Sequence, residues 1–260
     1  MGIWLPNLVE WVVAEFALAR AGLICVTLNP AYRLNELEFA LNRTECRALI
    51  TARAFRSSDF IGMLTAMLPE LPTSRPGALN AARVNSLRWA IQVADDTAPG
   101  CLPFDVVAAR ATPADRAALA VVDAGIQFDA PVCIQFTSGT TGLPKGATLS
   151  HHNMVNNAAQ LTGAMRLRTD DRLCVPVPMF HCFGYVVSTL VCALSGATMV
   201  FSGPAFDPLS VLRTVQDACC TALHGVPTMF IAELGHAAFD GLDLSTLRTG
   251  CIAGARAPRR

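Results

Sequence analysis

The feature that most constrains the fold is a regular alternation of two kinds of segment along the chain. Short apolar runs rich in β-branched residues recur from end to end, and stretches with helical periodicity separate them. Strands joined through helices run parallel and need helices on both faces, so this order predicts an α/β fold with mostly parallel sheets covered by helices. The expected strands are 23–28, 47–51, 89–94, 132–136, 173–177 and 198–201, and the expected helices are 7–21, 56–68, 152–165 and 208–218.

Capping signals predict where two helices begin. Asn7, with Glu10 three residues later, has the spacing of a capping box, and Asn35 with Glu38 repeats it. We therefore expect a helix to begin at each asparagine. The Pro-, Gly- and Ser-rich residues 69–86 predict a loop.

Charge and cysteine content exclude several classes of protein. Lys and Arg number 20, Asp and Glu number 20, and 52% of the residues are hydrophobic. Nucleic-acid binding needs a surplus of cations and disorder needs low hydrophobicity, so we expect neither. The ten cysteines are scattered without a CxxC pair, which favours a reducing compartment. No basic segment precedes the first apolar stretch, so we expect no signal peptide and a cytoplasmic location, or the mitochondrial matrix in a eukaryote.

One long segment leaves a membrane alternative open. Residues 182–201 lack charged side chains and are long enough to cross a bilayer. Gly184 and Gly196 interrupt the segment, and its end, ATMVF, is β-branched and typical of a strand. We therefore expect a buried helix followed by a buried strand, and keep a membrane span as the alternative.

The segment that is most informative about function is 132–150, VCIQFTSGTTGLPKGATLS. An expected strand ends at Phe136, a loop rich in Gly, Ser and Thr follows, and Lys145 precedes a second expected strand. Glycines let backbone N–H groups converge, and the hydroxyls and one ammonium add donors, so the loop predicts a polyphosphate cradle. The spacing fits neither a Walker A loop nor GxGxxG. A polar hairpin joining two strands is the structural alternative.

The segment FTSGTTGLPKGATLSH resembles the phosphate-loop signature of the adenylate-forming (AMP-dependent synthetase/ligase) superfamily. Flanking segments, including PNLVEWVVAEFALARAGL, PMFHCFGYV, HGVPTMFIAEL and LRTGCIAGARAP, resemble the same enzymes in the same order. The sequence of these segments is most similar to that of medium-chain fatty acyl-CoA synthetases. The resemblance implies that residues 1–260 are part of the large N-terminal, AMP-binding domain of such an enzyme, without its small C-terminal domain.

The resemblance also implies roles for individual residues. His181 borders the acyl carboxylate site and is the expected catalytic residue, and no metal ligand is expected. Independently of the resemblance, Cys219, Cys220 and His224 are expected in the core and not on a metal, because adjacent cysteines rarely reach one zinc ion and no second pair exists. The phosphates of ATP would be held by Thr137, Ser138, Gly139, Thr140, Thr141, Gly142, Leu143, Pro144 and Lys145. The adenine would pack on Gly254 and Ala255, and the acyl chain on His181, Gly225, Val226, Pro227 and Thr228.

The reaction implied by the resemblance is a fatty acid–CoA ligation. A carboxylate and Mg-ATP would give acyl-AMP and pyrophosphate, and coenzyme A would then displace AMP. The family's later motifs would lie beyond residue 260, and Lys145 is the only lysine. We therefore do not expect this chain to turn over by itself. A non-catalytic remnant that binds nucleotide or acyl groups, and the membrane protein using 182–201, are the alternatives.

Overall fold

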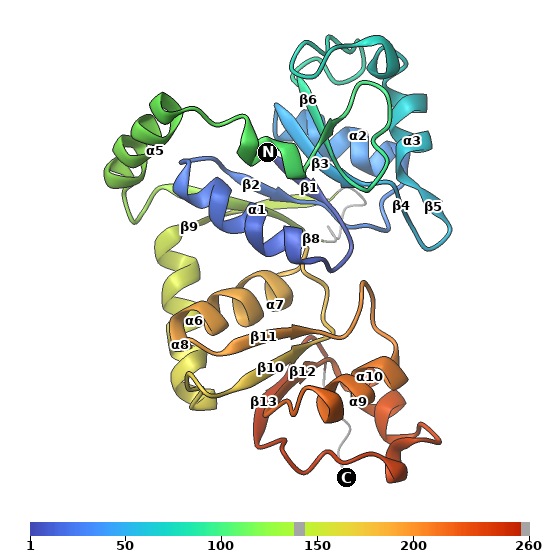
Figure 1. Ribbon diagram of the computed structural model, residues 1–260, viewed down its shortest axis with the longest axis vertical. Helices are drawn as coiled ribbons and strands as arrows, with labels where there is room; N and C mark the ends of the chain where they lie inside the picture. Colours follow the sequence, from blue (N-terminus) through green and yellow to red (C-terminus); the bar gives the residue numbers. More distant parts are fainter. Residues whose placement is uncertain (138–143, 256–260) are drawn as a thin grey trace. The chain divides into compact units, whose positions relative to one another are not determined.

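The computed structural model describes residues 1–137 and 144–255, which divide into two compact units (Figure 1). Unit 1 is Met1–His151 and unit 2 is His152–Arg260, and each is described by itself. Both units consist of a parallel or mostly parallel sheet with helices, so the predicted α/β class is confirmed.

The described part of unit 1 is built on a seven-stranded sheet in the order β7-β6-β3-β1-β2-β8-β9. Every neighbouring pair is parallel except β8 and β9, which are antiparallel. The strands are β1 (Gly2–Trp4), β2 (Cys25–Thr27), β3 (Ala48–Ala52), β6 (Trp89–Val93), β7 (Leu102–Pro103), β8 (Pro131–Thr137) and β9 (Lys145–Ser150). A small hairpin, β4 (Ala54–Phe55) and β5 (Ser58–Asp59), stands apart from this sheet.

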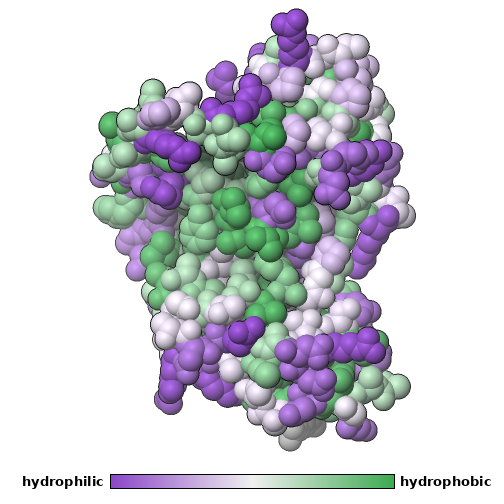
Figure 2. All heavy atoms as spheres, viewed as in Figure 1, coloured by the Kyte–Doolittle hydropathy of each residue, from purple (hydrophilic) through white to green (hydrophobic). Residues whose placement is uncertain are grey.

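The helices of unit 1 surround a core that includes the stacked rings of Trp4 and Phe60, 3.8 Å apart. They are α1 (Val9–Arg20), α2 (Leu34–Arg43), α3 (Phe60–Met67), the short 3-10 helix η1 (Leu71–Thr73), α4 (Asp105–Ala109) and α5 (Pro113–Gly125). Apolar side chains gather on the visible surface over α1, where Val9, Val13 and Phe16 are exposed at helical spacing (Figure 2). The local sequence patterns do not predict α4 and α5.

The predicted capping boxes are wrong in position. Helix α1 begins at Val9 with Leu8 as its N-cap and no side-chain cap. In α2 the N-cap is Arg33, and its backbone N–H donates to Glu36, 3.1 Å away. The glutamate of a capping box lies three residues after the N-cap, so with Arg33 as the N-cap this residue is Glu36. Glu38 forms an ion pair with Arg83 instead.

The predicted helix 56–68 begins later, at Phe60. Residues 54–59 form the β4–β5 hairpin, and the Asp59 side chain then accepts from the N–H of Gly62 at 2.9 Å. An aspartate at an N-cap satisfies a free N–H of the first turn, which explains why the helix starts after Asp59.

Unit 2 contains a four-stranded parallel sheet in the order β11-β10-β12-β13. The strands are β10 (Arg172–Val175), β11 (Thr198–Phe201), β12 (Ala222–Gly225) and β13 (Thr249–Ile252). Helix α6 (His151–Met165) leads into the unit, and the other helices are α7 (Cys182–Gly184), the π-helix η2 (Tyr185–Leu190), α8 (Val191–Ser195), α9 (Pro208–Asp217), α10 (Pro227–Leu234) and the 3-10 helix η3 (Phe239–Gly241). The core between the sheet and α9 includes Cys174, Val211 and Cys220.

The segment 182–201 is not a membrane-spanning helix. It folds as α7, η2 and α8, ends its helical part at Gly196 with a left-handed φ of 74°, and continues into β11. Within the ranges 1–137 and 144–255, no helix has both the length and the apolar character needed to cross a membrane. The expected order of a helix followed by a strand is therefore confirmed, but the strand is not buried as expected, because β11 is at the edge of its sheet.

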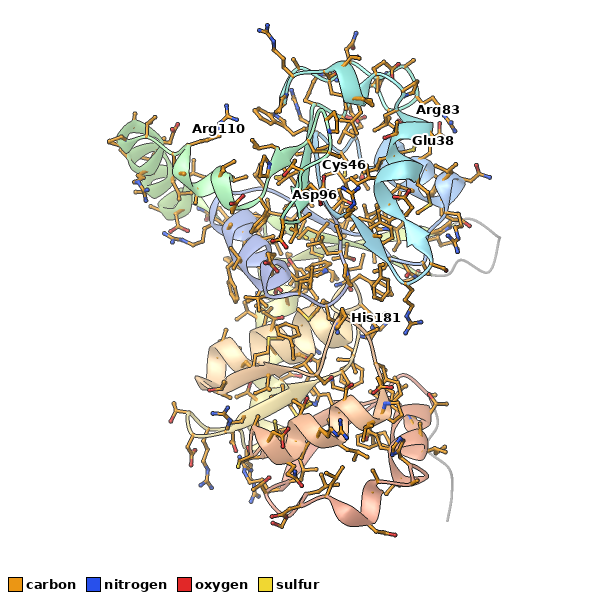
Figure 3. The ribbon with its side chains drawn as sticks, turned by 45° about the vertical axis from the view of Figure 1, so that its right-hand side comes forward. Glu38, Cys46, Arg83, Asp96, Arg110 and His181 are labelled. Atoms are coloured by element: carbon orange, nitrogen blue, oxygen red, sulfur yellow. The ribbon has the colours of Figure 1, made fainter. Side chains whose placement is uncertain are left out.

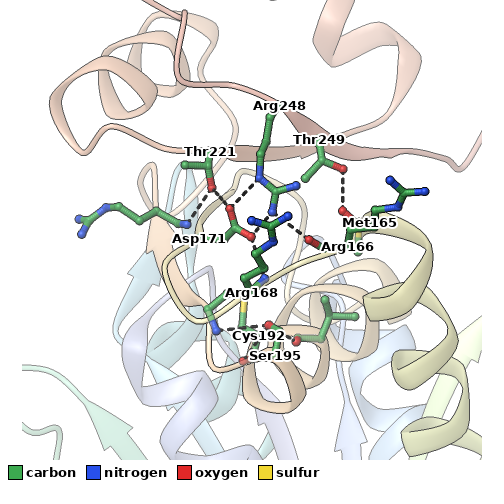
Figure 4. A network of polar contacts seen from close by, with 12 residues as sticks. Met165, Arg166, Arg168, Asp171, Cys192, Ser195, Thr221, Arg248 and Thr249 are labelled. Carbon is green, nitrogen blue, oxygen red and sulfur yellow. Dashed lines mark hydrogen bonds and ion pairs between the residues drawn. The ribbon is translucent and has the colours of Figure 1, made fainter.

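A polar network anchors the N-terminal ends of three strands of unit 2 (Figure 4). The buried carboxylate of Asp171, just before β10, accepts from Thr221 Oγ1 at 2.6 Å and from Arg248 Nε at 3.0 Å. Thr221 precedes β12 and Arg248 precedes β13, so one carboxylate joins the starts of β10, β12 and β13. This network lies at the opposite end of the strands from Gly225 and Gly254, two of the ligand residues predicted in unit 2.

Candidate functional site

Thr137 and Lys145, the described residues near the two ends of the predicted phosphate loop, lie at the ends of two paired strands in unit 1. Strand β8 ends at Thr137, β9 begins at Lys145, and these two residues are register partners across the antiparallel pair. The hydroxyl of Thr137 lies 3.5 Å from the carbonyl oxygen of Lys145. The predicted second strand is confirmed, and its antiparallel pairing with β8 agrees with the structural alternative as well. Thr137 and Lys145 therefore lie side by side at one end of the strand pair.

Not all of the predicted phosphate residues can be placed. Thr137, Pro144 and Lys145 are described, and Lys145 is exposed at the start of the edge strand β9. The remaining predictions, Ser138, Gly139, Thr140, Thr141, Gly142 and Leu143, lie outside the described residues.

A pocket of about 490 Å³ lies beside Lys145 on the α2 face of the hairpin. Phe136 forms part of its apolar wall and meets Phe39 of α2 edge-on at 6.5 Å. Lys145 and Arg43, at the end of α2, contribute two cations, and the described lining residues include no carboxylate. A concave surface with cations and no compensating anion attracts anionic ligands. Arg43 was not predicted, because only the packing of α2 against β8 brings it beside Lys145.

The predicted adenine and acyl residues of unit 2 follow the C-terminal ends of neighbouring parallel strands. Gly225 is the last residue of β12, and Gly254 follows β13. The N–H of Ala253 donates to the carbonyl oxygen of Gly225 at 3.3 Å, so the structure brings these two segments together. In open α/β sheets, ligands bind outside the carboxyl ends of the strands.

Close packing explains the glycine at position 254. Its φ is +87°, which favours glycine, and a Cβ built there would lie 3.1 Å from Cγ1 of Val226. Ala255, the next residue, is exposed. The small side chains therefore leave backbone open to solvent beside Val226.

Residues 226–228 form a strand-to-helix turn. Val226 is the N-cap of α10, and its carbonyl oxygen accepts from the N–H of Met229 at 2.9 Å. Pro227 is the first helical residue, where a missing N–H has no cost, and Thr228 is exposed in the first turn. These residues thus form an ordinary strand-to-helix turn, and their role in acyl binding stays a prediction.

His181 is the N-cap of the helical segment that follows β10 (Figure 3). Its Nδ1 accepts from the backbone N–H of Phe183 at 3.2 Å and lies 3.5 Å from Cys182 Sγ. Partial burial of the ring lowers the pKa of His181, so the imidazole is neutral at pH 7. Because Nδ1 accepts, the proton of the neutral ring is on Nε2. The ring therefore offers Nε2–H as a hydrogen-bond donor.

Two of the three expected core residues near β12 are buried. Cys220 and His224 are fully buried, as predicted, whereas Cys219 is exposed in a turn with a left-handed φ of 48°. The chain reverses direction between α9 and β12, so adjacent side chains at 219 and 220 point to different environments. The prediction for Cys219 is wrong for that reason.

Residues 1–260 match the family described as AMP-binding enzyme. The chain is 41% identical over 258 residues to the Bacillus subtilis protein YngI, a candidate acyl-CoA synthetase by its name. The match covers 99% of this chain and 47% of that protein. It is also 41% identical over 262 residues to the mitochondrial medium-chain acyl-CoA ligase ACSF2 of Danio rerio. That match covers 99% of this chain and 43% of the relative. These matches confirm the predicted superfamily.

The fold agrees with that of a solved CoA ligase. The crystal structure of the anthranilate CoA ligase AuaEII in complex with anthranoyl-AMP has a TM-score of 0.78 at 23% identity. The match covers 99% of this chain and 45% of that one. The chain thus spans about half the length of the relatives it matches.

Proposed function

The chain belongs to the AMP-binding enzyme family, and from this premise we propose that it is the ATP- and acyl-binding part of a fatty acid–CoA ligase. The proposed reaction has two steps. A carboxylate oxygen attacks the α-phosphorus of ATP, and pyrophosphate leaves to give acyl-AMP. The thiolate of coenzyme A then attacks the acyl carbon, and AMP leaves.

The single observation that carries the proposal is the cationic pocket beside the β8–β9 hairpin. Lys145 and Arg43 line a volume of about 490 Å³ that holds no described carboxylate. This charge fits the β- and γ-phosphates of ATP, which we propose are held there together with the hydroxyl of Thr137. Fixed cations that neutralise a polyphosphate assist its departure as pyrophosphate.

We propose that His181 binds the carboxylate of the acyl substrate. Its Nε2–H is a donor, and a neutral donor can hydrogen-bond the attacking carboxylate without competing for the phosphates as a cation would. Gly225, Val226, Pro227 and Thr228 would contact the acyl chain. Gly254 and Ala255, beside Val226, would leave room for the flat adenine ring.

Magnesium and coenzyme A have different roles in the proposed reaction. The described lining of the pocket offers cations and hydroxyls but no carboxylate, which Mg²⁺ prefers, so the pocket residues do not fit the metal by themselves. We take Mg²⁺ only as the counter-ion of ATP and derive no step through it. Coenzyme A is the acyl acceptor named in the relatives.

The names of relatives support the substrate class and the location. We propose a medium-chain fatty acid, because the Danio rerio relative is a medium-chain ligase, and cytoplasm or mitochondrial matrix, because that relative is mitochondrial. Small molecules are the proposed partners.

Two measurements on this chain test the proposal. Calorimetric titrations with ATP and with a non-hydrolysable octanoyl-AMP analogue test binding, and octanoate-dependent exchange of labelled pyrophosphate into ATP tests acyl-AMP formation. We expect both ligands to bind. Binding without exchange would support a binding-only part, and failure of both ligands to bind would contradict the proposal.

A further inference from the structure

His224 is a fully buried histidine in the centre of the unit 2 sheet. It lies in β12, directly before Gly225, and its Nε2 is 3.0 Å from the carbonyl oxygen of Val187. A carbonyl oxygen only accepts, so Nε2 carries the proton and donates. Burial lowers the pKa of His224, so the ring stays neutral at pH 7 with Nδ1 unprotonated.

Val187 belongs to the π-helix η2, which continues the helical segment that His181 caps. Two side chains of this helix bond back to the preceding turn: Ser188 Oγ to Phe183 O at 2.9 Å, and Thr189 Oγ1 to Gly184 O at 3.3 Å. A π-helix is rare in proteins, and these two bonds support it here. The donation from His224 connects the π-helix to the sheet.

A second contact leads from His224 to His181 through Phe183. The rings of His224 and Phe183 are 5.3 Å apart and tilted by 34°. The backbone N–H of the same Phe183 donates to His181 Nδ1 at 3.2 Å. The position of Phe183 therefore decides which nitrogen of His181 accepts and which keeps its proton.

Close packing fixes the turn between these residues. A Cβ built on Gly184 would lie 2.3 Å from the carbonyl oxygen of Pro178, so only glycine lets this turn lie against residues 178–179. The turn cannot move toward that segment, and His224 holds it from the side of the sheet.

We propose that His224 is a positioning residue that fixes the orientation and the Nε2–H tautomer of His181 through Phe183 and Val187. It thereby couples the end of β12, where Gly225 begins the proposed acyl segment, to the proposed donor for the acyl carboxylate. The assignment of His181 to that carboxylate rests on the proposed function, whereas the coupling between the two histidines does not.

The test is a nitrogen-15 NMR measurement of the His181 ring in the 260-residue chain. His181→Asn assigns the signals by their loss. In the wild type we expect the shift pattern of the Nε2–H tautomer and slow exchange of the Phe183 amide proton. His224→Phe keeps an aromatic ring against Phe183 but removes the donor, and should give a mixture of tautomers and at least tenfold faster exchange. His224→Gln, which restores an N–H donor, should recover most of the wild-type pattern.

A matched control separates this effect from general loss of stability. Val215→Ala removes buried volume from the core that contains Leu223. Successive residues of a strand point to opposite faces, so this core lies on the other face of β12 from His224, and the His181 signals should stay unchanged. An unchanged His181 tautomer in a folded His224→Phe variant would overturn the proposal. If that variant does not fold, Phe183→Leu removes the ring contact instead, and unchanged His181 signals there would overturn it equally.

A ligand measurement distinguishes this proposal from the proposed function. We expect His224→Phe to weaken binding of the octanoyl-AMP analogue about tenfold relative to AMP, because only the analogue carries the acyl group. If the wild-type chain binds neither ligand, the proposed function fails while the NMR result still decides the coupling. Equal weakening of both ligands in His224→Phe would overturn the positioning role in acyl binding.

Discussion

Thr137 and Lys145 face each other across the β8–β9 pair, with the Thr137 hydroxyl 3.5 Å from the Lys145 carbonyl oxygen. This relationship places the ammonium at the start of an edge strand, where a single neighbouring strand supports its backbone. The side chain is exposed beside a pocket that also contains Arg43. The geometry leads to two predictions about nucleotide binding.

Replacing Lys145 should weaken nucleotide binding. A hydrogen bond to a charged group contributes about 1.5–3 kcal/mol, so Lys145→Ala should lower ATP affinity roughly ten- to a hundredfold in a calorimetric titration. Lys145→Arg keeps the charge and should lose less. Equal ATP affinity in the wild type and Lys145→Ala would contradict the assignment.

Arg43→Gln tests whether the pocket belongs to the same site. Loss of one of two pocket cations should lower ATP affinity several-fold and reduce its dependence on salt, because exposed charges are screened by ions. Arg116→Gln, on the exposed surface of α5, is the matched control and should leave affinity unchanged. The same small effect in both variants would separate the pocket from the nucleotide site.

His181→Asn should separate capping from ligand binding. Asparagine is a good N-cap, so the free energy of unfolding should change by less than about 0.5 kcal/mol, while His181→Ala should lose about 1 kcal/mol. Both variants lack Nε2–H and should bind the octanoyl-AMP analogue about tenfold more weakly. Full affinity in His181→Asn would remove His181 from the acyl site.

Asp171→Ala should destabilise unit 2. The carboxylate is buried but its partner Arg248 is partly exposed, so the loss is that of hydrogen bonds to a charged group, about 1.5–3 kcal/mol. Asp123→Ala, which breaks the exposed pair with Arg20, should cost about 0–1 kcal/mol. Urea unfolding followed by a signal from each unit measures both. A similar small loss in the two variants would contradict the structural role of Asp171.

Acid should weaken the same network. Burial raises the pKa of Asp171, but hydrogen bonds from Arg248, Thr221 and the Arg168 backbone outweigh it, and the pKa is lowered overall. The unfolded state therefore takes up the proton first, so this contribution is present above about pH 4 and is lost as the pH falls further. Urea unfolding of the wild type should show a loss below pH 4 that Asp171→Ala lacks. Equal losses in both would contradict it.

Glu233→Gln should stabilise the protein at alkaline pH. Burial raises the pKa of Glu233 to about 7, and its Oε1 has no hydrogen-bond partner in the described part of the chain. The folded state keeps the proton that the unfolded state releases above about pH 4.5, so stability falls between pH 4.5 and 7. The variant should gain up to about 3 kcal/mol at pH 8 and little at pH 4.5. Parallel pH profiles would contradict this.

The sequence was sufficient where a local pattern has one physical outcome. Alternating apolar runs must pair as strands, so the six expected strands are found within a few residues of their predicted positions. The phosphate-loop signature and its neighbours were sufficient to identify the family. Local patterns were less reliable for helix starts, because the start of α2 depends on how the chain leaves β2, and Arg33 rather than Asn35 became the N-cap.

By itself, then, the sequence determined the α/β class, the family and the residues expected to bind ligand. Only the tertiary structure decided that Arg43 joins Lys145 in one pocket, that the backbone of Gly225 meets Ala253, and that His224 contacts both Phe183 and Val187. These residues are far apart along the chain. Their proximity results from the order of strands in each sheet and the packing of helices on it, which no local pattern contains.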